Sequence, residues 1–192
     1  EIGYLFGMYK RITNQYESGV ITGKGLGWGG SLVRTEATGF GSVFFAAEML
    51  KVRGEELEGK TAIVSGSGNV AIYTIQKLQQ LGAKVIACSD SDGVVYDEAG
   101  IDLDLLKELK EVERTRISSY SERKAGSRYL PNGNIWDVPC QVAFPSATQN
   151  EINGRDAAAL VKNGCIAVSE GANMPTTPDG IRTFLDAGVS FG

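Results

Sequence analysis

One stretch of this sequence, Lys60 to Gly82, restricts the possible folds more than any other, because an apolar run leads through glycines directly into a helical pattern. Residues 61–65 (TAIVS) suit a buried parallel strand. Residues 66–71 (GSGNVA) then fit the dinucleotide-binding fingerprint, with alanine in its last place. The apolar residues after the turn recur at three- and four-residue steps, which predicts a helix with one buried face. The stretch therefore predicts a strand–turn–helix unit of the Rossmann type.

The residues of the turn suit a bound pyrophosphate. Gly66 permits a tight turn, Gly68 lets a phosphate approach the backbone, and Ala71 leaves room for the helix to pack on the strand. The helix N-terminus also offers unpaired amides to an anion. A glycine pattern alone fits an ordinary strand–turn–helix without a ligand equally well. The next apolar run favours the ligand, because it ends at Ser89-Asp90, about twenty residues beyond the glycines, where this fold places the group that contacts the ribose.

The rest of the chain alternates between strand and helix patterns. Further apolar runs that are typical of strands occupy residues 84–88, 94–96, 141–145, 165–169 and 189–192. Helical patterns lie between them, and three begin with a capping residue, at Asp102, Asn153 and Thr177. This alternation predicts an α/β fold, a doubly wound and mostly parallel Rossmann-type sheet with helices on both faces.

The first residues differ in pattern from the remainder. Residues 1–17 have a helical apolar face, and residues 19–31 (GVITGKGLGWGGS) contain six glycines. We expect residues 1–32 to be an inter-domain helix and a glycine-rich crossing segment, and residues 33–192 to be a Rossmann-type NAD(P)-binding domain from a longer enzyme. A glycine-rich phosphate loop with Lys24 is the alternative, but no Lys-Ser/Thr pair follows it.

Composition excludes several classes of function. The net charge of −4, with no basic cluster interleaved with aromatics, argues against nucleic acid as the partner. No run approaches the ~18 apolar residues of a membrane span. The chain has no histidine and only three isolated cysteines, so we expect no metal site and no histidine-based triad. Widely spaced cysteines in apolar runs indicate buried free thiols and a reducing compartment, which predicts a cytoplasmic protein.

Polar residues follow two of the predicted strands. Residues 147–150 (ATQN) come after one run and residues 170–175 (EGANMP) come after another, and open α/β sheets bind ligands at the carboxyl ends of their strands. Cations also gather after the helix that Asp102 caps, beginning with Lys110. They form either a solvated surface or a patch that reaches a 2′-phosphate. Gly39 and Gly41, near the start of a helix, indicate close approach by a ligand or by another helix.

Six blocks together resemble the glutamate dehydrogenase family, and they run through the chain in the family's order: TGKGLGWGGS (22–31), RTEATGFG (34–41), SGSGNVA (65–71), CSDSDG (88–93), PSATQNEI (145–152) and EGANMPTT (170–177). The branch that the chain resembles most is hexameric and NADP-specific. The resemblance implies a cytoplasmic homohexamer in nitrogen assimilation and amino-acid metabolism, an oxidoreductase that interconverts L-glutamate with 2-oxoglutarate and ammonia. It also implies that the catalytic lysines and aspartate lie outside this chain, so we expect the fragment alone to be inactive.

The resemblance and the turn together assign the cofactor-binding residues. They are Thr38, Gly66, Ser67, Gly68, Asn69, Val70, Ser89, Asp90, Lys110, Arg114, Ala147, Thr148, Gln149 and Asn173. Thr38 matches the nicotinamide end, and Lys110 matches the 2′-phosphate site, with Arg114 or Arg116 as substitutes. An acid at Asp90 would by itself favour NAD. Because the NADP-specific branch is similar in carrying Ser-Asp-Ser here, we expect NADP, with NAD as the less favoured cofactor.

Three other functions stay open from the sequence. A related dehydrogenase for leucine, phenylalanine or valine would share much of this pattern, although the EGANMPTT block and the residues near Lys110 speak against it. A nucleotide-binding module without catalysis would also keep the glycine turn. A Rossmann-like domain for another adenine ligand is the third alternative.

Overall fold

The computed structural model describes residues 1–192, and they form two compact units, Glu1–Arg34 and Thr35–Gly192. The smaller unit contains α1 (Ile2–Thr13) and the short 3-10 helix η1 (Leu26–Trp28). The helix α1 ends before the expected residue 17, because Asn14 takes the left-handed conformation, with φ 55°. Phe6 is the buried residue of α1, and its ring meets the ring of Tyr16 edge-on, with 5.4 Å between centroids.

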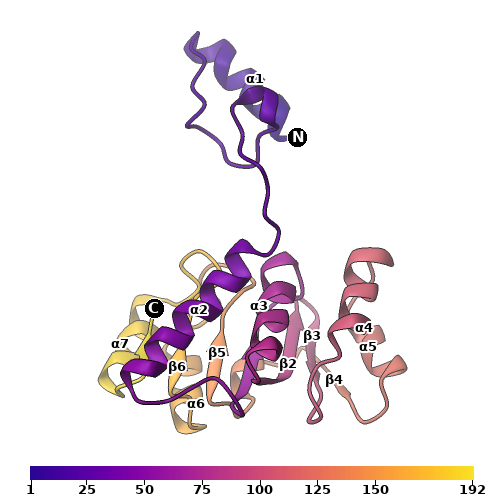
Figure 1. Ribbon diagram of the computed structural model, residues 1–192, viewed down its shortest axis with the longest axis vertical. Helices are drawn as coiled ribbons and strands as arrows, with labels where there is room; N and C mark the ends of the chain where they lie inside the picture. The colour runs from indigo at the N-terminus through magenta and orange to yellow at the C-terminus, as the bar shows by residue number, and fades with distance from the viewer. The chain divides into compact units, whose positions relative to one another are not determined.

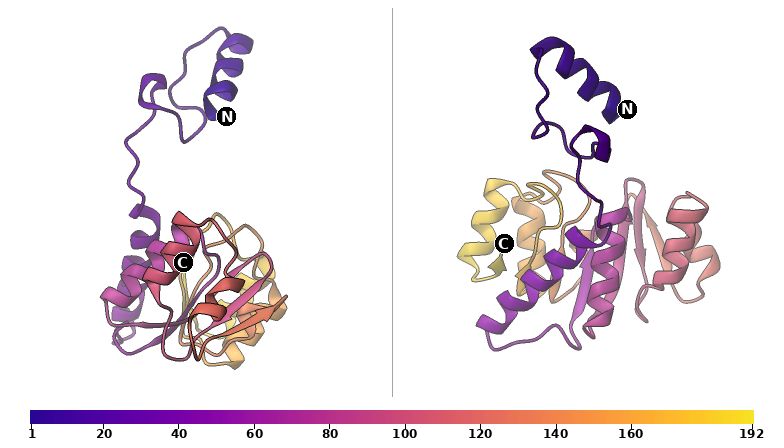
Figure 2. Two further views of the ribbon diagram at one scale, coloured as in Figure 1. Left: turned by 90° about the vertical axis from the view of Figure 1, so that its right-hand side faces the viewer. Right: turned by 45° about the horizontal axis from the view of Figure 1, so that its top comes forward.

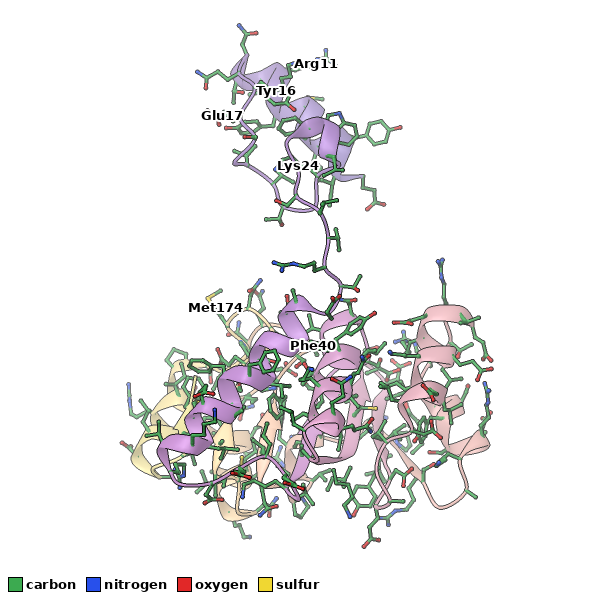
Figure 3. All side chains as sticks on the ribbon, viewed as in Figure 1. Arg11, Tyr16, Glu17, Lys24, Phe40 and Met174 are labelled. Carbon is green, nitrogen blue, oxygen red and sulfur yellow. The ribbon has the colours of Figure 1, made fainter.

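Lys24 has a structural role within the smaller unit. Its ammonium group donates hydrogen bonds to the carbonyl oxygens of Val20 and Ile21, both at 2.5 Å, and it lies 5.8 Å from the centroid of the Phe6 ring. Figure 3 shows Lys24 among the loops of this unit. The side chain is 8% exposed. Its donors are thus engaged by the glycine-rich segment itself.

The larger unit is built on one seven-stranded sheet. In sheet order the strands are β4 (Arg128–Pro131), β3 (Gly93–Tyr96), β2 (Lys84–Asp90), β1 (Thr61–Val64), β5 (Val142–Phe144), β6 (Ala167–Val168) and β7 (Ser190–Phe191). The five adjacent strands β2, β1, β5, β6 and β7 pair in parallel, whereas β3 and β4 are antiparallel to their neighbours. The predicted mostly parallel α/β sheet is confirmed.

Helices cover both faces of this sheet (Figures 1 and 2). In chain order they are α2 (Ala37–Val52), α3 (Asn69–Gln80), α4 (Leu103–Lys107) with the π-helical turn η2 (Glu108–Val112), α5 (Ser118–Arg123), the 3-10 helix η3 (Ile135–Asp137), α6 (Gly154–Lys162) and α7 (Pro178–Asp186). One buried cluster joins the sheet to α2, α3, α4 and α5, and a second joins it to η3, α6 and α7. This is the doubly wound arrangement that alternating strands and helices produce.

Among the strands and α-helices, β4 and α5 were not predicted from the sequence. Strand β4 lies at the edge of the sheet, ends at Pro131 and is largely exposed, so it lacks the apolar run of an inner strand. In α5, Tyr120 is the buried residue among polar neighbours, so the segment has no helical periodicity. Both elements are specified by tertiary contacts instead.

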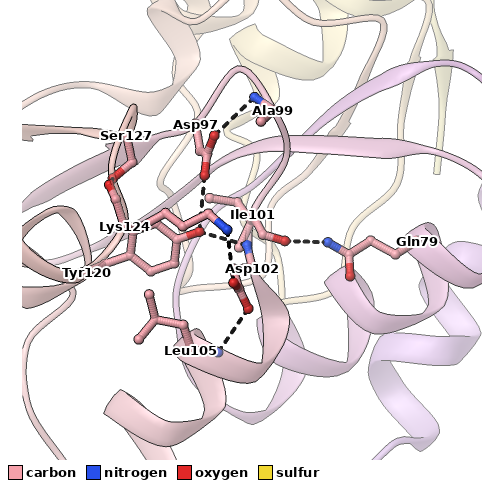
Figure 4. Close-up of polar contacts among 9 residues, drawn as sticks. All are labelled: Gln79, Asp97, Ala99, Ile101, Asp102, Leu105, Tyr120, Lys124 and Ser127. Carbon is pink, nitrogen blue, oxygen red and sulfur yellow. Dashed lines mark hydrogen bonds and ion pairs between the residues drawn. The ribbon is translucent and has the colours of Figure 1, made fainter.

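A polar network around Tyr120 holds α5 against the sheet (Figure 4). The Tyr120 hydroxyl donates to a carboxylate oxygen of Asp97 at 3.3 Å and accepts the amide of Asp102 at 2.7 Å. Asp102 also accepts the Leu105 amide at the start of α4 and pairs with Lys124 at 3.0 Å. The predicted cap at Asp102 is therefore confirmed, and the same carboxylate links α4 to α5.

Caps define the last two helices differently. Asn153 and Asp156 form a capping box at the start of α6, as the Asn153 cap predicts. Thr177 occupies the cap position of α7, but its hydroxyl, with one hydrogen to donate, lies between two acceptors, the Ile152 carbonyl and the Asp179 carboxylate, and accepts no amide. The predicted start of α7 is confirmed, while the mechanism of its cap is different.

Gly39 shows why α2 lies so close to α3. A Cβ atom at this residue would come within 2.6 Å of the Thr74 amide nitrogen and 2.7 Å of the Val70 carbonyl oxygen. A Cβ atom at Gly41 would meet nothing within 4 Å. Of the two sequence-based explanations, helix packing accounts for Gly39, whereas no protein atom closely approaches Gly41.

The parallel strands all end at one edge, the upper edge of the sheet in Figure 1. The glycine turn after β1 and the loops after β2, β5 and β6 therefore come together there. None of the helices has the length and apolarity to span a lipid bilayer.

Candidate functional site

Two adjoining cavities lie at the carboxyl edge of the sheet. The larger has a volume of about 640 Å³ and is lined by Gly66, Ser67, Gly68, Asn69, Val70, Ser89, Asp90, Ser91, Lys110, Arg116, Ser146, Ala147, Thr148 and Glu151. The smaller has a volume of about 440 Å³ and is lined by Thr38, Val70, Ser146, Ala147, Thr148, Gln149, Gly171, Ala172 and Asn173. The shared residues Val70, Ser146, Ala147 and Thr148 join the cavities into one groove. Of the fourteen residues that the sequence proposes, the structure brings thirteen to this groove.

The glycine turn forms one wall of the larger cavity. Gly66 has φ +85°, and a Cβ atom there would lie 3.2 Å from Ala147, so the turn requires glycine for both its conformation and its contact. Gly68 precedes α3, and a Cβ atom there would meet no protein atom within 4 Å. No side chain caps the N-terminus of α3. The backbone at Gly68 is therefore open to an approaching ligand, and the first amides of α3 favour a negative one.

Ser89 and Asp90 lie at the end of β2, and their side chains accept hydrogen bonds from nearby backbone amides. The Ser89 hydroxyl accepts the amide of Gly66 at 3.0 Å and so joins the glycine turn to β2. One carboxylate oxygen of Asp90 accepts the Asp92 amide at 2.9 Å, and the other accepts the Ile117 amide at 3.2 Å. Both oxygens of Asp90 thus hold the turn between β2 and β3 and the start of α5.

Cations reach the larger cavity from the segment between α4 and α5. Lys110 donates to the Thr115 carbonyl at 3.0 Å, and Arg116 donates to the Ser91 hydroxyl at 2.7 Å and pairs with Asp92 at 3.3 Å. Arg116 lines the cavity, whereas Arg114 is exposed and lines neither cavity. Two further cations nearby in the sequence form ion pairs away from the cavity. Arg123 pairs with Glu108 and Glu113, and Lys124 pairs with Asp102.

The smaller cavity lies between the start of α2 and the loops after β5 and β6. Thr38 comes from the first turn of α2, Gln149 from the loop after β5 and Asn173 from the loop after β6. The two loops touch, because a Cβ atom at Gly171 would lie 2.7 Å from the Ser146 hydroxyl and 3.0 Å from the Val70 side chain. Figure 3 labels Met174, the exposed residue that follows Asn173 in this loop.

Several lining residues were not identified from the sequence as binding residues. One is Ser91, directly after β2, and the other four are Ser146, Glu151, Gly171 and Ala172. All four lie in or directly beside the polar segments that follow β5 and β6, so the position of those segments was the available signal. Glu151 shows its role only in three dimensions, because its carboxylate oxygen accepts the amides of Ala147 at 3.1 Å and Thr148 at 3.3 Å.

The groove fits a dinucleotide. Each cavity is within the usual size range for ligand sites, about 300–1,000 Å³. The open backbone at Gly68 and the uncapped N-terminus of α3 suit a pyrophosphate at the middle of such a ligand. The smaller cavity is lined by uncharged polar side chains, and the larger one also has two cations. This difference suits a dinucleotide, whose two ends differ in chemistry. The structure contains no group of three His, Cys, Asp or Glu side chains that could hold a metal ion.

Comparisons with known proteins agree with this site. The model of the family described as Glutamate/Leucine/Phenylalanine/Valine dehydrogenase matches residues 29–192. An NADP-specific glutamate dehydrogenase of Helicobacter pylori is 57% identical over the whole chain, and an NAD(P)-specific glutamate dehydrogenase of Xylanibacter ruminicola is 56% identical over the whole chain. The crystal structure of Plasmodium falciparum glutamate dehydrogenase superimposes on 99% of the chain, with a TM-score of 0.82 and 48% identity.

These relatives are longer than this chain. The chain spans 44% of the Helicobacter protein, 43% of the Xylanibacter protein and 41% of the Plasmodium structure. The family model covers most of the chain and includes every element that lines the groove. The chain therefore belongs to the glutamate/leucine/phenylalanine/valine dehydrogenase family.

Proposed function

We propose that this chain is the cofactor-binding domain of an NADP-dependent glutamate dehydrogenase, an oxidoreductase that interconverts L-glutamate with 2-oxoglutarate and ammonia. The observation that carries the proposal is the continuous groove at the carboxyl edge of the sheet, with the open glycine turn in its wall and Lys110 and Arg116 at the larger cavity. The names of the Helicobacter and Xylanibacter relatives support the choice of substrate, and the name of the Helicobacter relative supports NADP.

Different residues of the groove then bind different parts of the cofactor. Gly66, Ser67, Gly68, Asn69 and Val70 bind the pyrophosphate. Ser89, Asp90 and Lys110 surround the adenosine ribose, with Arg116 in the place that Arg114 was expected to take. Thr38, Ala147, Thr148, Gln149 and Asn173 bind the nicotinamide end. The bound nicotinamide supplies or accepts the hydride, and these side chains orient it and fix the ring face that meets the substrate.

The environment of Asp90 supports NADP over NAD. An acidic residue at this position favours NAD when its carboxylate is free to accept the ribose hydroxyls. Here each carboxylate oxygen already accepts one backbone amide, which reduces its capacity to accept the ribose hydroxyls, and Ser91, Lys110 and Arg116 line the same cavity. A 2′-phosphate carries negative charge and strong acceptor oxygens, for which these cations are suitable partners.

We further propose that the remaining parts of the enzyme supply the chemistry. No residue of this chain is assigned a catalytic role, and the catalytic lysines and aspartate belong to the rest of a longer protein, a cytoplasmic homohexamer that works in nitrogen assimilation. The three cysteines are free and buried, as in proteins of a reducing compartment. The isolated chain then binds the cofactor without oxidising glutamate, and turnover by the isolated chain would contradict this part of the proposal.

A titration of the protein with NADPH and with NADH, followed by ligand fluorescence, tests the cofactor assignment. We expect NADPH to bind more tightly. Arg116→Ala removes one cation from the larger cavity, so it should weaken NADPH binding by about tenfold while changing NADH binding little, because a charged hydrogen bond contributes roughly 1.5–3 kcal/mol.

Arg155→Ala is the matched control, because Arg155 is an exposed arginine that lines neither cavity. It should leave both affinities unchanged. Tighter binding of NADH than of NADPH would refute the NADP assignment, and equal affinity for AMP and NADPH would indicate another adenine ligand. In the longer protein, oxidation of leucine or phenylalanine in preference to glutamate would refute the substrate assignment.

A further inference from the structure

The loop after β5 has most of its amides held by specific acceptors. The Ser146 amide donates to the Ser65 hydroxyl at 2.8 Å, and the Asn150 amide donates to the Met174 carbonyl at 3.0 Å. Between them, the amides of Ala147 and Thr148 share one acceptor, the carboxylate oxygen Oε1 of Glu151. One side chain therefore fixes the middle of a loop whose residues line both cavities.

The backbone of Glu151 is itself firmly held. The indole Nε1 of the buried Trp136 donates to the Glu151 carbonyl at 3.0 Å. The next residue, Ile152, is fully buried and forms a parallel bridge with Thr176. The backbone that carries the carboxylate is thus fixed in place, whereas Ala147, Thr148 and Gln149 are exposed at the groove.

The position of the loop affects two walls of the site. Ala147 lies against the glycine turn, where a Cβ atom at Gly66 would be 3.2 Å away. Thr148 lines both cavities and Gln149 lines the smaller one. A small shift of this loop would therefore change the contact with the turn and the groups at the smaller cavity together.

We propose that Glu151 is a positioning residue for the cofactor: its carboxylate orders residues 146–149, and through them it holds Thr148 and Gln149 where the nicotinamide end binds. This inference rests on the proposed function, since it names what the ordered loop is for. Glu151 contacts the loop amides, and the loop contacts the cofactor.

The charge of Glu151 makes the effect depend on pH. Burial raises the pKa of the Glu151 carboxyl, and the nearby charge of Glu170 raises it further, while the Ser65 hydroxyl and the two loop amides lower it. Lys110 and Arg116 are the cations that line the same cavity. Protonation of Glu151 weakens it as an acceptor for the amides, so the loop loosens at a higher pH than an ordinary glutamate would require.

The test uses Glu151→Gln, which keeps the size of the side chain and removes its charge. In the protein without ligand, we expect amide hydrogen exchange at Ala147 and Thr148 to become at least about fivefold faster, because the strong acceptor is lost. Affinity for NADPH and for NADH should fall by about fivefold at about pH 8, with little change in the melting temperature.

A series of titrations from about pH 5 to about pH 8 separates positioning from a general structural effect. Binding of NADH by the unmodified protein should weaken as the pH falls, and Glu151→Gln should remove that dependence. NADH is the informative ligand, because the 2′-phosphate of NADPH itself titrates near a pKa of about 6. Glu170→Gln removes the neighbouring charge and should shift the midpoint to lower pH while leaving the slow exchange of the loop amides intact.

Glu122→Gln is the control for net charge, since Glu122 is exposed and lies outside both cavities. An equal loss of affinity in this variant, or unchanged exchange and affinity in Glu151→Gln, would overturn the inference. If the unmodified protein binds neither nucleotide, the proposed function fails. The exchange measurement then shows whether Glu151 orders the loop, and unchanged exchange would refute that part as well.

Discussion

Asp90 illustrates how neighbouring backbone determines the role of a single residue. Its position at the end of β2 is where an acid accepts the ribose hydroxyls of NAD. In the folded chain, each of its carboxylate oxygens accepts one backbone amide, from Asp92 and from Ile117. Arg116, more than twenty residues away in the sequence, reaches the same corner by bonding to Ser91 at 2.7 Å. We therefore expect cofactor preference at this corner to depend on the cations that line the cavity as well as on Asp90.

Cys88 provides a prediction about pH at the residue scale. It is fully buried in β2, and burial raises the pKa of its thiol to about 12. Above a pH of about 9 the unfolded chain loses this proton while the folded chain retains it, so stability falls as the pH rises, by up to about 1.4 kcal/mol per pH unit. Cys88→Ala should lose less stability than the unmodified protein between about pH 9 and about pH 10.

Urea unfolding at several pH values measures this difference. The small cavity left by the substitution lowers stability equally at every pH, so the slope against pH is the informative quantity. Tyr120 is also buried with a raised pKa and gives both proteins a common alkaline loss. Parallel slopes for the two proteins would show that the Cys88 thiol does not contribute.

At the scale of elements, the packing of α2 on α3 places Thr38 beside the loops that carry Thr148 and Asn173. This packing depends on Gly39, because backbone atoms of α3 lie so close to it that a Cβ atom there would clash with them. Thr74 from α3 also lies 3.5 Å from the Ser42 hydroxyl of α2, so the two helices meet through small polar side chains. The smaller cavity is thereby set by a contact between two helices.

Gly39→Ala and Gly41→Ala form a matched pair of variants in one helix. Gly39→Ala forces the helices apart and should lower the free energy of unfolding by about 1–3 kcal/mol, because overpacking in a core costs that much. Gly41→Ala adds a methyl group in open space and should raise it by up to about 1 kcal/mol through helix propensity. Chemical unfolding of both proteins gives the comparison, and equal effects would show that the contact at Gly39 is not limiting.

At the scale of the whole molecule, the chain consists of two units with different cores. Residues 35–192 contain both buried clusters and every residue that lines the groove. In residues 1–34, Phe6 is the buried apolar side chain, and large apolar side chains such as Tyr4 and Ile12 are 86% and 77% exposed. Because both buried clusters belong to residues 35–192, we expect the larger unit to be stable without residues 1–34.

Removal of residues 1–34 tests this independence. We expect residues 35–192 to melt within a few degrees of the complete chain and to bind NADPH within about twofold of its affinity, since a core of this size folds alone. Residues 1–34 alone should be unfolded, because a short isolated helix is marginal in water. A large loss of melting temperature in residues 35–192 would refute the division.

Much of the fold followed from the sequence because its signals are local. The glycine turn at 66–71 and the apolar runs of the inner strands reflect backbone conformation and burial within a few residues, so they identified the sheet and its ligand edge. The weakly patterned elements β4 and α5 could not be found in this way, because the antiparallel pairing of β4 with β3 and the burial of Tyr120 hold them in place.

The sequence by itself determined the α/β class, the dinucleotide turn and the two polar segments that line the groove. Only the tertiary structure decided how those parts act together. In the folded chain, both oxygens of Asp90 accept backbone amides, and Arg116 rather than Arg114 lines the cavity. The carboxylate of Glu151 accepts the amides of Ala147 and Thr148. The physical reason is that backbone conformation is encoded by adjacent residues, whereas the partner of a polar side chain depends on distant segments that only folding brings within hydrogen-bonding distance.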